Sequence, residues 1–286
     1  MKKLFAVFTF LAFIFACLVK IKRDTHYFKL EKVMFRSSKI PEDAKFTILQ
    51  ISDLHNHVFG NDHERLISAV QNTNADLIVL TGDLIDKTTM TFEHILPLVD
   101  QLTAINEHVY FVPGNHEWEN GRTAEFFNAL REHSVTLLNN RHTRITKGSA
   151  TINLAGIDDP GTEHDNLGEA FRDIGNTHYT ILLSHSPGII KQNEPIPADL
   201  ILSGHTHGGQ IRLPLIGALI APGQGYFPTY DKGTFHISDG LHLYIDSGAG
   251  TTRLPIRFLN KSQISLITIA GVTGVRQRAQ PTRTNK

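Results

Sequence analysis

Short apolar runs alternate with amphipathic stretches along most of this chain. The runs at 46–51 and 77–80 are short and almost wholly apolar, as in strands buried on both faces. Between such runs apolar residues recur at helical spacing, for example Leu66, Ile67 and Val70. The pattern predicts an α/β fold with mixed sheets. The expected helices are 62–71, 92–104 and 123–132, and the expected strands are 46–51, 77–80, 109–112, 151–157, 179–183, 200–202, 241–245 and 264–269.

The N-terminal segment is a separate hydrophobic element. Two lysines precede an apolar run at 4–19, and three basic residues follow it. Sixteen helical residues span about 24 Å, less than the hydrocarbon core of a bilayer at about 30 Å, but flanking lysines can snorkel. The pattern favours an uncleaved membrane anchor over 1–23, with a cleaved or lipidated signal and a buried helix as alternatives.

Charge around this segment predicts which side of the membrane holds the rest of the chain. Basic residues are far more numerous after the apolar run than before it, so the positive-inside bias places the bulk of the chain on the cytoplasmic side. Residues 24–45 are expected to form a basic linker, either against anionic headgroups or free in solvent. A single domain is expected over 46–270 and a disordered tail over 271–286. The basic residues after the run are Lys20, Lys22, Arg23, Lys29, Lys32, Arg36 and Lys39.

Composition narrows the class of function. The 286 residues include 28 basic and 28 acidic side chains, so the whole chain lacks the basic footprint of a nucleic-acid-binding protein. One cysteine excludes an internal disulfide framework. Histidine, the commonest metal ligand, occurs 16 times, so the positions of the histidines matter most.

Five polar blocks follow five of the predicted strands. Ligands in α/β sheets gather beyond the carboxyl ends of strands, so residues far apart in the sequence are expected to converge on one edge. Glycines in and beside the blocks allow sharp turns; they are Gly82, Gly114, Gly204, Gly208 and Gly209. The potential donors in the blocks are Asp53, His55, Asp83, Asn115, His116, His185, His205 and His207.

The chemistry of these donors predicts a dinuclear metal site. All eight are oxygen or nitrogen donors, and seven of them as ligands already exceed what one tetrahedral ion needs. Two divalent ions that share a carboxylate would use them. The mixed donor set suits Mn, Fe, Zn or Co better than Mg or Ca, and manganese is favoured.

The order of the motifs resembles the calcineurin-like metallophosphoesterase superfamily. The order is D-x-H, G-D, G-N-H-E, a later single histidine and G-H-T-H, and the resemblance covers about 46–258. The stretches 248–250 and 254–257 are similar to the C-terminal pattern of its bacterial membrane-associated, class III phosphodiesterase-like branch. The resemblance implies a sandwich of two mixed β-sheets flanked by helices, anchored at the cell inner membrane as a single-pass or peripheral protein.

The resemblance also implies a role for each donor. His116 would be the catalytic residue, beside the substrate phosphate, where it could stabilise the developing charge or protonate the leaving oxygen. Asp86 and Glu117 are candidates to orient the ligating imidazoles. The remaining histidines, among them His57, and the single Trp118 are expected to be packing or surface residues. Asp53, His55 and His207 would hold one ion, Asn115, His185 and His205 the other, and Asp83 would bridge both.

The expected function is a metal-dependent phosphoesterase that cleaves phosphodiester or pyrophosphate bonds. The partner is a phosphorylated small molecule or a lipid-linked substrate, for which the resemblance suggests UDP-2,3-diacylglucosamine in lipid A synthesis. The alternatives are a general phosphodiesterase with a soluble or cell-wall substrate and a non-catalytic metal-binding scaffold. The apolar stretch 213–221 would border the site as a groove for acyl chains or form a core hairpin, and 223–240 is expected to be a long surface loop.

Overall fold

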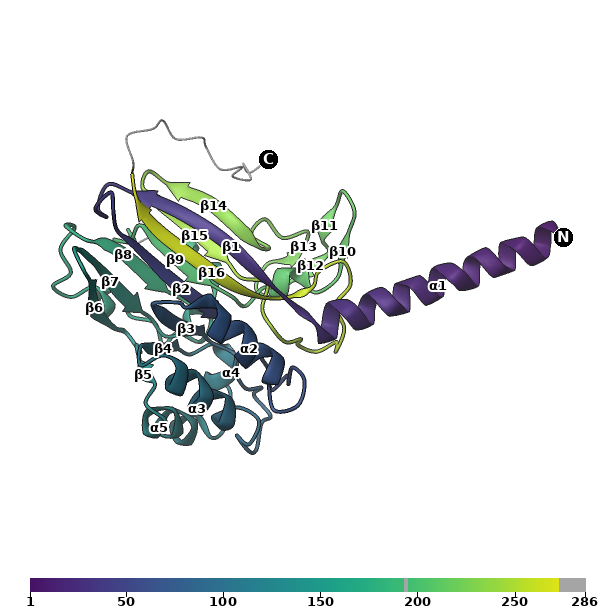
Figure 1. Cartoon of the computed structure of the whole chain (residues 1–286), viewed down its shortest axis with the longest axis horizontal. Helices are drawn as coiled ribbons and strands as arrows, with labels where there is room; N and C mark the ends of the chain where they lie inside the picture. The colour runs from purple at the N-terminus through teal and green to yellow at the C-terminus, as the bar shows by residue number, and fades with distance from the viewer. Residues whose placement is uncertain (193–194, 273–286) are drawn as a thin grey trace.

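The computed structural model describes residues 1–192 and 195–272 (Figure 1), and within them two six-stranded sheets face each other. The first sheet has the order β1-β16-β2-β3-β4-β5. Strands β2 to β5 are parallel, whereas β16 runs antiparallel to β2 and parallel to β1. The bounds are β1 (Phe28–Ser37), β2 (Lys45–Ile51), β3 (Leu77–Thr81), β4 (Val109–Val112), β5 (Thr136–Leu137) and β16 (Ser262–Gly271).

The second sheet repeats this mixed arrangement, in the order β14-β15-β9-β8-β7-β6. Its four central strands are parallel, and both edge strands are antiparallel to their neighbours. The bounds are β6 (Arg141–Lys147), β7 (Ala150–Gly156), β8 (Tyr179–Leu183), β9 (Leu200–Ser203), β14 (Gly233–Ser238) and β15 (Leu241–Ile245).

The main core lies between the sheets. Phe46 and Ile48 of the first sheet belong to one apolar cluster with Ile152, Ile181 and Leu202 of the second, and all five side chains are fully buried. Each such side chain contributes about 1.5–3 kcal/mol when it leaves water. The predicted sandwich of two mixed sheets flanked by helices is confirmed.

Three helices cover the outer face of the first sheet, where they pack on Leu49, Ile78 and Phe111. The helix predicted at 123–132 has these bounds, whereas the one predicted at 92–104 begins only at Leu96, with a proline in its first turn. The helices are α2 (Glu64–Thr73), α3 (Leu96–Ile105) and α5 (Thr123–Glu132), and the short turns are α4 (Asn115–Trp118), α6 (Leu167–Ala170), η1 (Pro160–Thr162), η2 (Pro187–Lys191) and η3 (His207–Gly209).

Two short hairpins follow the last polar block. The first pairs β10 (Arg212–Leu213) with β11 (Gly217–Ala218), and the second pairs β12 (Ile220–Ala221) with β13 (Gly225–Tyr226). The prediction of one long loop over 223–240 is therefore wrong. This stretch contains β13 and the edge strand β14, whose polar residues hid its alternation.

The expected linker over 24–45 is also wrong, because β1 lies within it. All ten residues of β1 pair with β16. Phe28 and Leu30 pack toward the helices, whereas Val33 and Phe35 pack toward the second sheet. Lysines between them hid the period of two, and charged side chains of this kind protect edge strands from further pairing. Of the tail predicted over 271–286, Gly271 ends β16, and 273–286 lie outside the described residues.

The N-terminal helix α1 (Lys2–His26) projects from this body (Figure 1). Its apolar side chains are exposed, and at 25 residues it is about 37 Å long, sufficient to cross a membrane. Its last turn contacts the body, where Asp24 and Thr25 are buried. The Thr25 hydroxyl accepts the Arg257 backbone N–H at 2.8 Å.

Candidate metal centre

The five polar blocks meet at one edge of the sandwich, because the strands that precede them end there side by side. Backbone hydrogen bonds join the blocks. The Asp53 N–H donates to the Gly82 carbonyl and the His55 N–H to the Asp83 carbonyl, both at 3.0 Å. In the second sheet the Gly204 N–H donates to the His185 carbonyl at 3.0 Å. The convergence expected from the sequence is therefore present in the fold.

Several donor residues have a backbone conformation that L-amino acids rarely adopt. A positive φ of this kind costs about 1–3 kcal/mol and persists only where the surroundings impose it. Strain of this sort concentrates at functional sites, and here it turns each short side chain back toward the common centre. The residues concerned are Asp53 (φ 52°), His55 (48°), Asp83 (53°), His205 (68°) and His207 (51°).

Two glycines are required by close approach. At Gly82, which has φ of 79°, a Cβ would lie 2.6 Å from the Gly114 nitrogen and from Nδ1 of His185. At Gly204 a Cβ would overlap the side chains of Ser52 and Asp53. Any larger residue at either position would therefore displace a donor.

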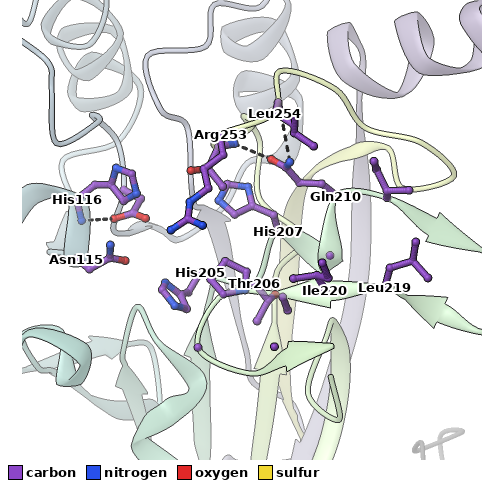
Figure 2. Close-up of a pocket in the computed structure, with 18 residues that line it drawn as sticks. Asn115, His116, His205, Thr206, His207, Gln210, Leu219, Ile220, Arg253 and Leu254 are labelled. Carbon is purple, nitrogen blue, oxygen red and sulfur yellow. Dashed lines mark hydrogen bonds between the residues drawn. The ribbon is translucent and has the colours of Figure 1, made fainter. Parts of the chain in front are cut away.

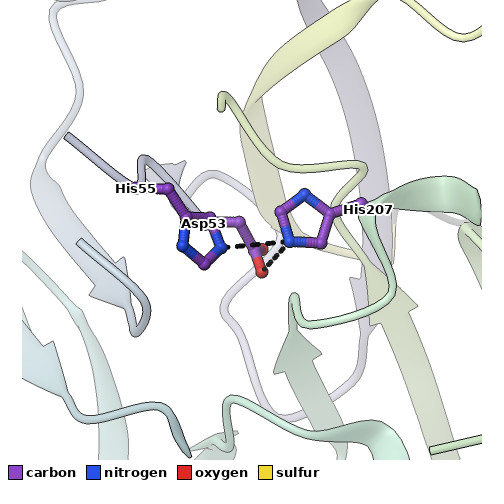
Figure 3. A group of neighbouring side chains, drawn as sticks. All are labelled: Asp53, His55 and His207. Atoms are coloured by element: carbon purple, nitrogen blue, oxygen red, sulfur yellow. Dashed lines mark hydrogen bonds and ion pairs between the residues drawn. The ribbon is translucent and has the colours of Figure 1, made fainter. Parts of the chain in front are cut away.

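The first group of donors consists of Asp53, His55 and His207 (Figure 3). Nε2 of His55 and Nε2 of His207 are 3.1 Å apart, and Nε2 of His207 is 3.4 Å from Oδ1 of Asp53. Two ligands that are each about 2.1 Å from one ion lie about 3.0–3.4 Å apart at octahedral or tetrahedral angles. The spacing therefore fits ligands of a single cation.

The second group consists of Asp83, His185 and His205. Nε2 of His185 is 3.1 Å from Oδ2 of Asp83 and 3.2 Å from Nδ1 of His205. The same Oδ2 is 3.6 Å from Nε2 of His55, so the Asp83 carboxylate lies between the two groups, where a bridging ligand belongs. Asn115 lines one cavity together with Asp83 and His205, and its Oδ1 is buried without a hydrogen-bond partner. This orphaned acceptor and the donor spacings together fit two divalent cations.

Electrostatics at the site also suit metal ligation. Burial lowers the pKa of His205 to about 3 and that of His207 well below its usual range, so both imidazoles are neutral, the form that binds metal. For His185, burial is outweighed by the carboxylates of Asp83 and Asp53, which raise its pKa well above the ordinary value. These carboxylates create the negative potential that attracts cations.

Hydrogen bonds to other residues fix several imidazoles of the site. Nδ1 of His185 lies 2.8 Å from the Thr81 carbonyl, which holds Nε2 toward the site. Nδ1 of His55 lies 2.8 Å from Oδ1 of Asp86. The same Asp86 oxygen is 3.3 Å from Nδ1 of His116. Asp86 therefore orients two imidazoles, as the sequence suggested it could.

Glu117 has a different task from the one expected of it. Its carboxylate accepts the backbone N–H groups of Asp83 at 2.8 Å, Leu84 at 2.7 Å and Gly114 at 2.8 Å. The side chain is fully buried. It therefore holds together the loops after β3 and β4 and orients backbone, with no imidazole among these partners.

His116 lies at the opening of the site and is half-buried. Its N–H donates to Oδ1 of Asp83 at 2.9 Å, and its ring meets that of His55 edge-on with centroids 4.7 Å apart. Burial disfavours the imidazolium, but the hydrogen bond with Asp86 and the charges of Asp83 and Asp86 outweigh it and raise the pKa of His116. His116 is thus suited to carry a proton. It also forms a possible donor group with His55 and Asp83.

A pocket of about 690 Å³ opens above the donors (Figure 2). His116, His205 and His207 line its polar floor. The opposite wall is apolar and comes from the hairpins and the loop after β15; it is formed by Ile211, Leu219, Ile220, Ala221, Pro222 and Leu254.

Two arginines in the loop after β15 belong to the site, although the sequence of this loop indicates only a family pattern and no role for them. Figure 2 shows the Arg253 guanidinium pointing into the pocket between His116 and His207. Arg257 is fully buried, and its Nη2 donates to the carbonyls of Ser247 at 2.8 Å and Gly250 at 2.6 Å. It also lies 3.4 Å from Nδ1 of His207. The only signal for these roles in the sequence is that both arginines follow a glycine-rich turn.

Two residues expected to have packing roles do pack. The Trp118 ring stacks on His164 with centroids 3.8 Å apart, outside the pocket lining. The His57 ring contacts Phe59 at 4.6 Å and belongs to none of the donor groups in the described residues. Proximity to His55 in the sequence therefore does not make His57 a donor.

Comparison with known proteins identifies the family. The model for calcineurin-like phosphoesterases matches residues 46–209. The uncharacterized metallophosphoesterase YkuE of Bacillus subtilis is 31% identical over 86% of this chain and 87% of its own length. A transmembrane protein with metallophosphoesterase domain from Danio rerio is 28% identical over 84% of this chain and 57% of its own length. Among solved structures, the NAD nucleotidase of Haemophilus influenzae is similar at 17% identity and a TM-score of 0.49, over 71% of this chain and 44% of its own.

The matched stretch contains all of the converging donors, from Asp53 to His207. The geometry of the site and the relationship by sequence lead to the same result. The chain belongs to the calcineurin-like phosphoesterase family and is a metal-dependent phosphoester hydrolase.

Proposed function

We propose that this protein is a dinuclear metal-dependent hydrolase of phosphodiester or pyrophosphate bonds, acting on a substrate with an apolar part at the cytoplasmic face of a membrane. The observation that carries the proposal is the pocket itself. Its floor includes four of the candidate metal ligands, whereas its opposite wall is apolar; the four are Asp83, Asn115, His205 and His207. A substrate that fills it would place a phosphate on the floor and an apolar group on the wall.

The donor geometry supports a role for each residue. Asp53, His55 and His207 would hold one ion, Asn115, His185 and His205 the other, and Asp83 both. Bound divalent cations, with manganese favoured, would supply Lewis acidity that lowers the pKa of water and offsets phosphate charge. His116, held by Asp86, would donate its proton to the leaving oxygen. Arg253 would pair with a further phosphate oxygen, as a substrate with more than one phosphate requires.

A lipid-linked pyrophosphate fits these features, and we propose UDP-2,3-diacylglucosamine, an intermediate of lipid A synthesis. Its pyrophosphate would meet the two ions and Arg253, and its acyl chains would follow Leu219, Ile220 and Leu254. The exposed apolar helix α1 supports anchoring at the inner membrane, and the relative from Danio rerio is named as a transmembrane protein. The excess of basic residues after the apolar run supports the cytoplasmic orientation.

Release of UMP tests this substrate. Purified full-length protein with manganese is incubated with UDP-2,3-diacylglucosamine in mixed micelles, and UMP is measured by chromatography. A generic aryl phosphodiester is the matched control. UMP release together with aryl phosphodiester hydrolysis supports the proposal. Hydrolysis of the aryl phosphodiester alone rejects the lipid A precursor and favours the alternative, a general phosphodiesterase with a soluble or cell-wall substrate.

A further inference from the structure

We infer that the two hairpins beside the pocket form a membrane-docking surface, which inserts into the headgroup region of a lipid bilayer and opens the pocket onto it. We call this surface the apolar rim. The inference rests on the membrane anchoring under the proposed function and deepens it. The apolar rim consists of Leu213, Leu215, Ile216, Ile220, Tyr226, Phe227, Leu254 and Leu259.

Exposed apolar side chains are concentrated in the apolar rim. Leu215 at the tip of the first hairpin is fully exposed, and Tyr226 and Phe227 are 77% and 67% exposed. Elsewhere in the described body after α1, the large hydrophobic residues with comparable exposure are only Tyr27, Met34 and Met90. Soluble proteins rarely gather so many exposed apolar side chains on one surface unless it binds a partner or a membrane.

The position of the apolar rim selects a bilayer as that partner. Figure 1 shows β10 to β13 on the side of the body from which α1 projects. The loop that carries Leu254 and Leu259 also carries Arg257, whose N–H donates to Thr25 at the end of α1. The apolar rim and the end of the anchor therefore share one structural unit. A helix that crosses the membrane brings both to its surface.

The hairpins are fixed in place. A buried ion pair joins Arg212 of β10 to Asp231 at 2.6 Å, and the Arg212 guanidinium also donates to the Gly208 carbonyl at 3.0 Å. Leu215 and Phe227 have positive φ values of 66° and 52°. The strained backbone turns these apolar side chains outward. An apolar environment outside the protein would explain this orientation.

The apolar rim is continuous with the pocket. Ile220 and Leu254 are exposed at 50% and 55% and also line the pocket. Beside them Leu219 leads to the floor that holds His207. The acyl chains of a substrate could therefore leave the bilayer along a continuous apolar path, without passing through water.

Depth-dependent quenching tests the docking. The full chain is placed in nanodiscs of phosphatidylethanolamine and phosphatidylglycerol containing doxyl lipids, and a fluorophore is attached at single cysteines. Cys17 of α1 is native and reports insertion of the anchor. In a Cys17→Ser background, Leu215→Cys and Phe227→Cys report the apolar rim. Met34→Cys is the control, because β1 runs away from α1 and places it about 23 Å further along.

We expect doxyl quenching at 17, 215 and 227 to be several-fold stronger than at 34. Quenching at 17 without quenching at 215 and 227 would overturn the inference while the anchor stands. Absence of quenching at 17 would overturn the anchoring, and the inference with it.

Substitution gives a second test. The double variant Leu215→Ser and Phe227→Ser changes two residues that do not line the pocket, so hydrolysis of the soluble aryl phosphodiester should be unchanged. Hydrolysis of UDP-2,3-diacylglucosamine in vesicles should fall about tenfold or more. Equal activity of the variant and the wild type on vesicles would contradict docking. If the wild type releases no UMP at all, the proposed substrate fails and the quenching result alone decides the inference.

Discussion

The floor of the pocket and its apolar rim are built in opposite ways. The donors at the floor, such as His205 and His207, are polar and largely buried, whereas rim residues such as Leu215 are apolar and exposed. The family match ends at residue 209, just before the hairpins begin. The matched stretch contains all of the donors, and all six residues of the apolar wall follow it. Under the proposed function, the floor would determine the reaction and the rim would determine the substrate.

The largest effect is expected at the centre of the floor. Asp83→Ala removes the carboxylate between the two donor groups, so two cations would lose their shared ligand and repel each other. We expect metal content to fall from about two ions per chain to fewer than one. Activity should fall by roughly 10³-fold or more, because Lewis-acid stabilisation supplies several kcal/mol. Elemental analysis and aryl phosphodiester hydrolysis measure the two effects.

The matched control for Asp83 is Asp62→Ala, which removes an exposed carboxylate outside the donor groups. It should leave both readouts unchanged. An Asp83→Ala protein that retains two tightly held ions would show that the carboxylate does not bridge them.

A smaller loss separates proton transfer from metal binding. His116→Ala should retain both ions but lose roughly 10²–10⁴ in kcat, the usual contribution of a general acid. A leaving group that needs no proton, such as nitrophenolate, should reduce this loss. Because His116 also lies within reach of His55 and Asp83, loss of metal in this variant would instead assign it to ligation.

The same contrast explains what the sequence could predict. The donors follow strands whose apolar runs are easily recognised, and the carboxyl ends of parallel strands meet at one edge. The convergence of the donors could therefore be expected from the order of strands and polar blocks along the chain. β1 was missed because charged residues alternate with its apolar ones, for example Lys29, Glu31 and Lys32. The positive φ of Asp53 and Asp83 was not predictable, because neighbouring loops impose it. The roles of Arg253 and Arg257 depend on how one loop folds over the site, which no local pattern encodes.

The smallest effect is expected at the boundary between floor and rim, where Arg253 points between His116 and His207. Arg253→Ala removes one charge-assisted contact with phosphate, worth about 1.5–3 kcal/mol. We therefore expect KM for UDP-2,3-diacylglucosamine to rise about tenfold to a hundredfold, with metal content unchanged. Arg253→Lys should recover part of the loss, because lysine keeps the charge but not the planar fork. Arg172→Ala, at an exposed arginine outside the pocket, is the control. If Arg253→Ala raises KM equally for an aryl phosphodiester, which has a single phosphate, Arg253 contacts the phosphate that every substrate carries. Arg253 would then belong to the floor and would not mark its boundary with the rim.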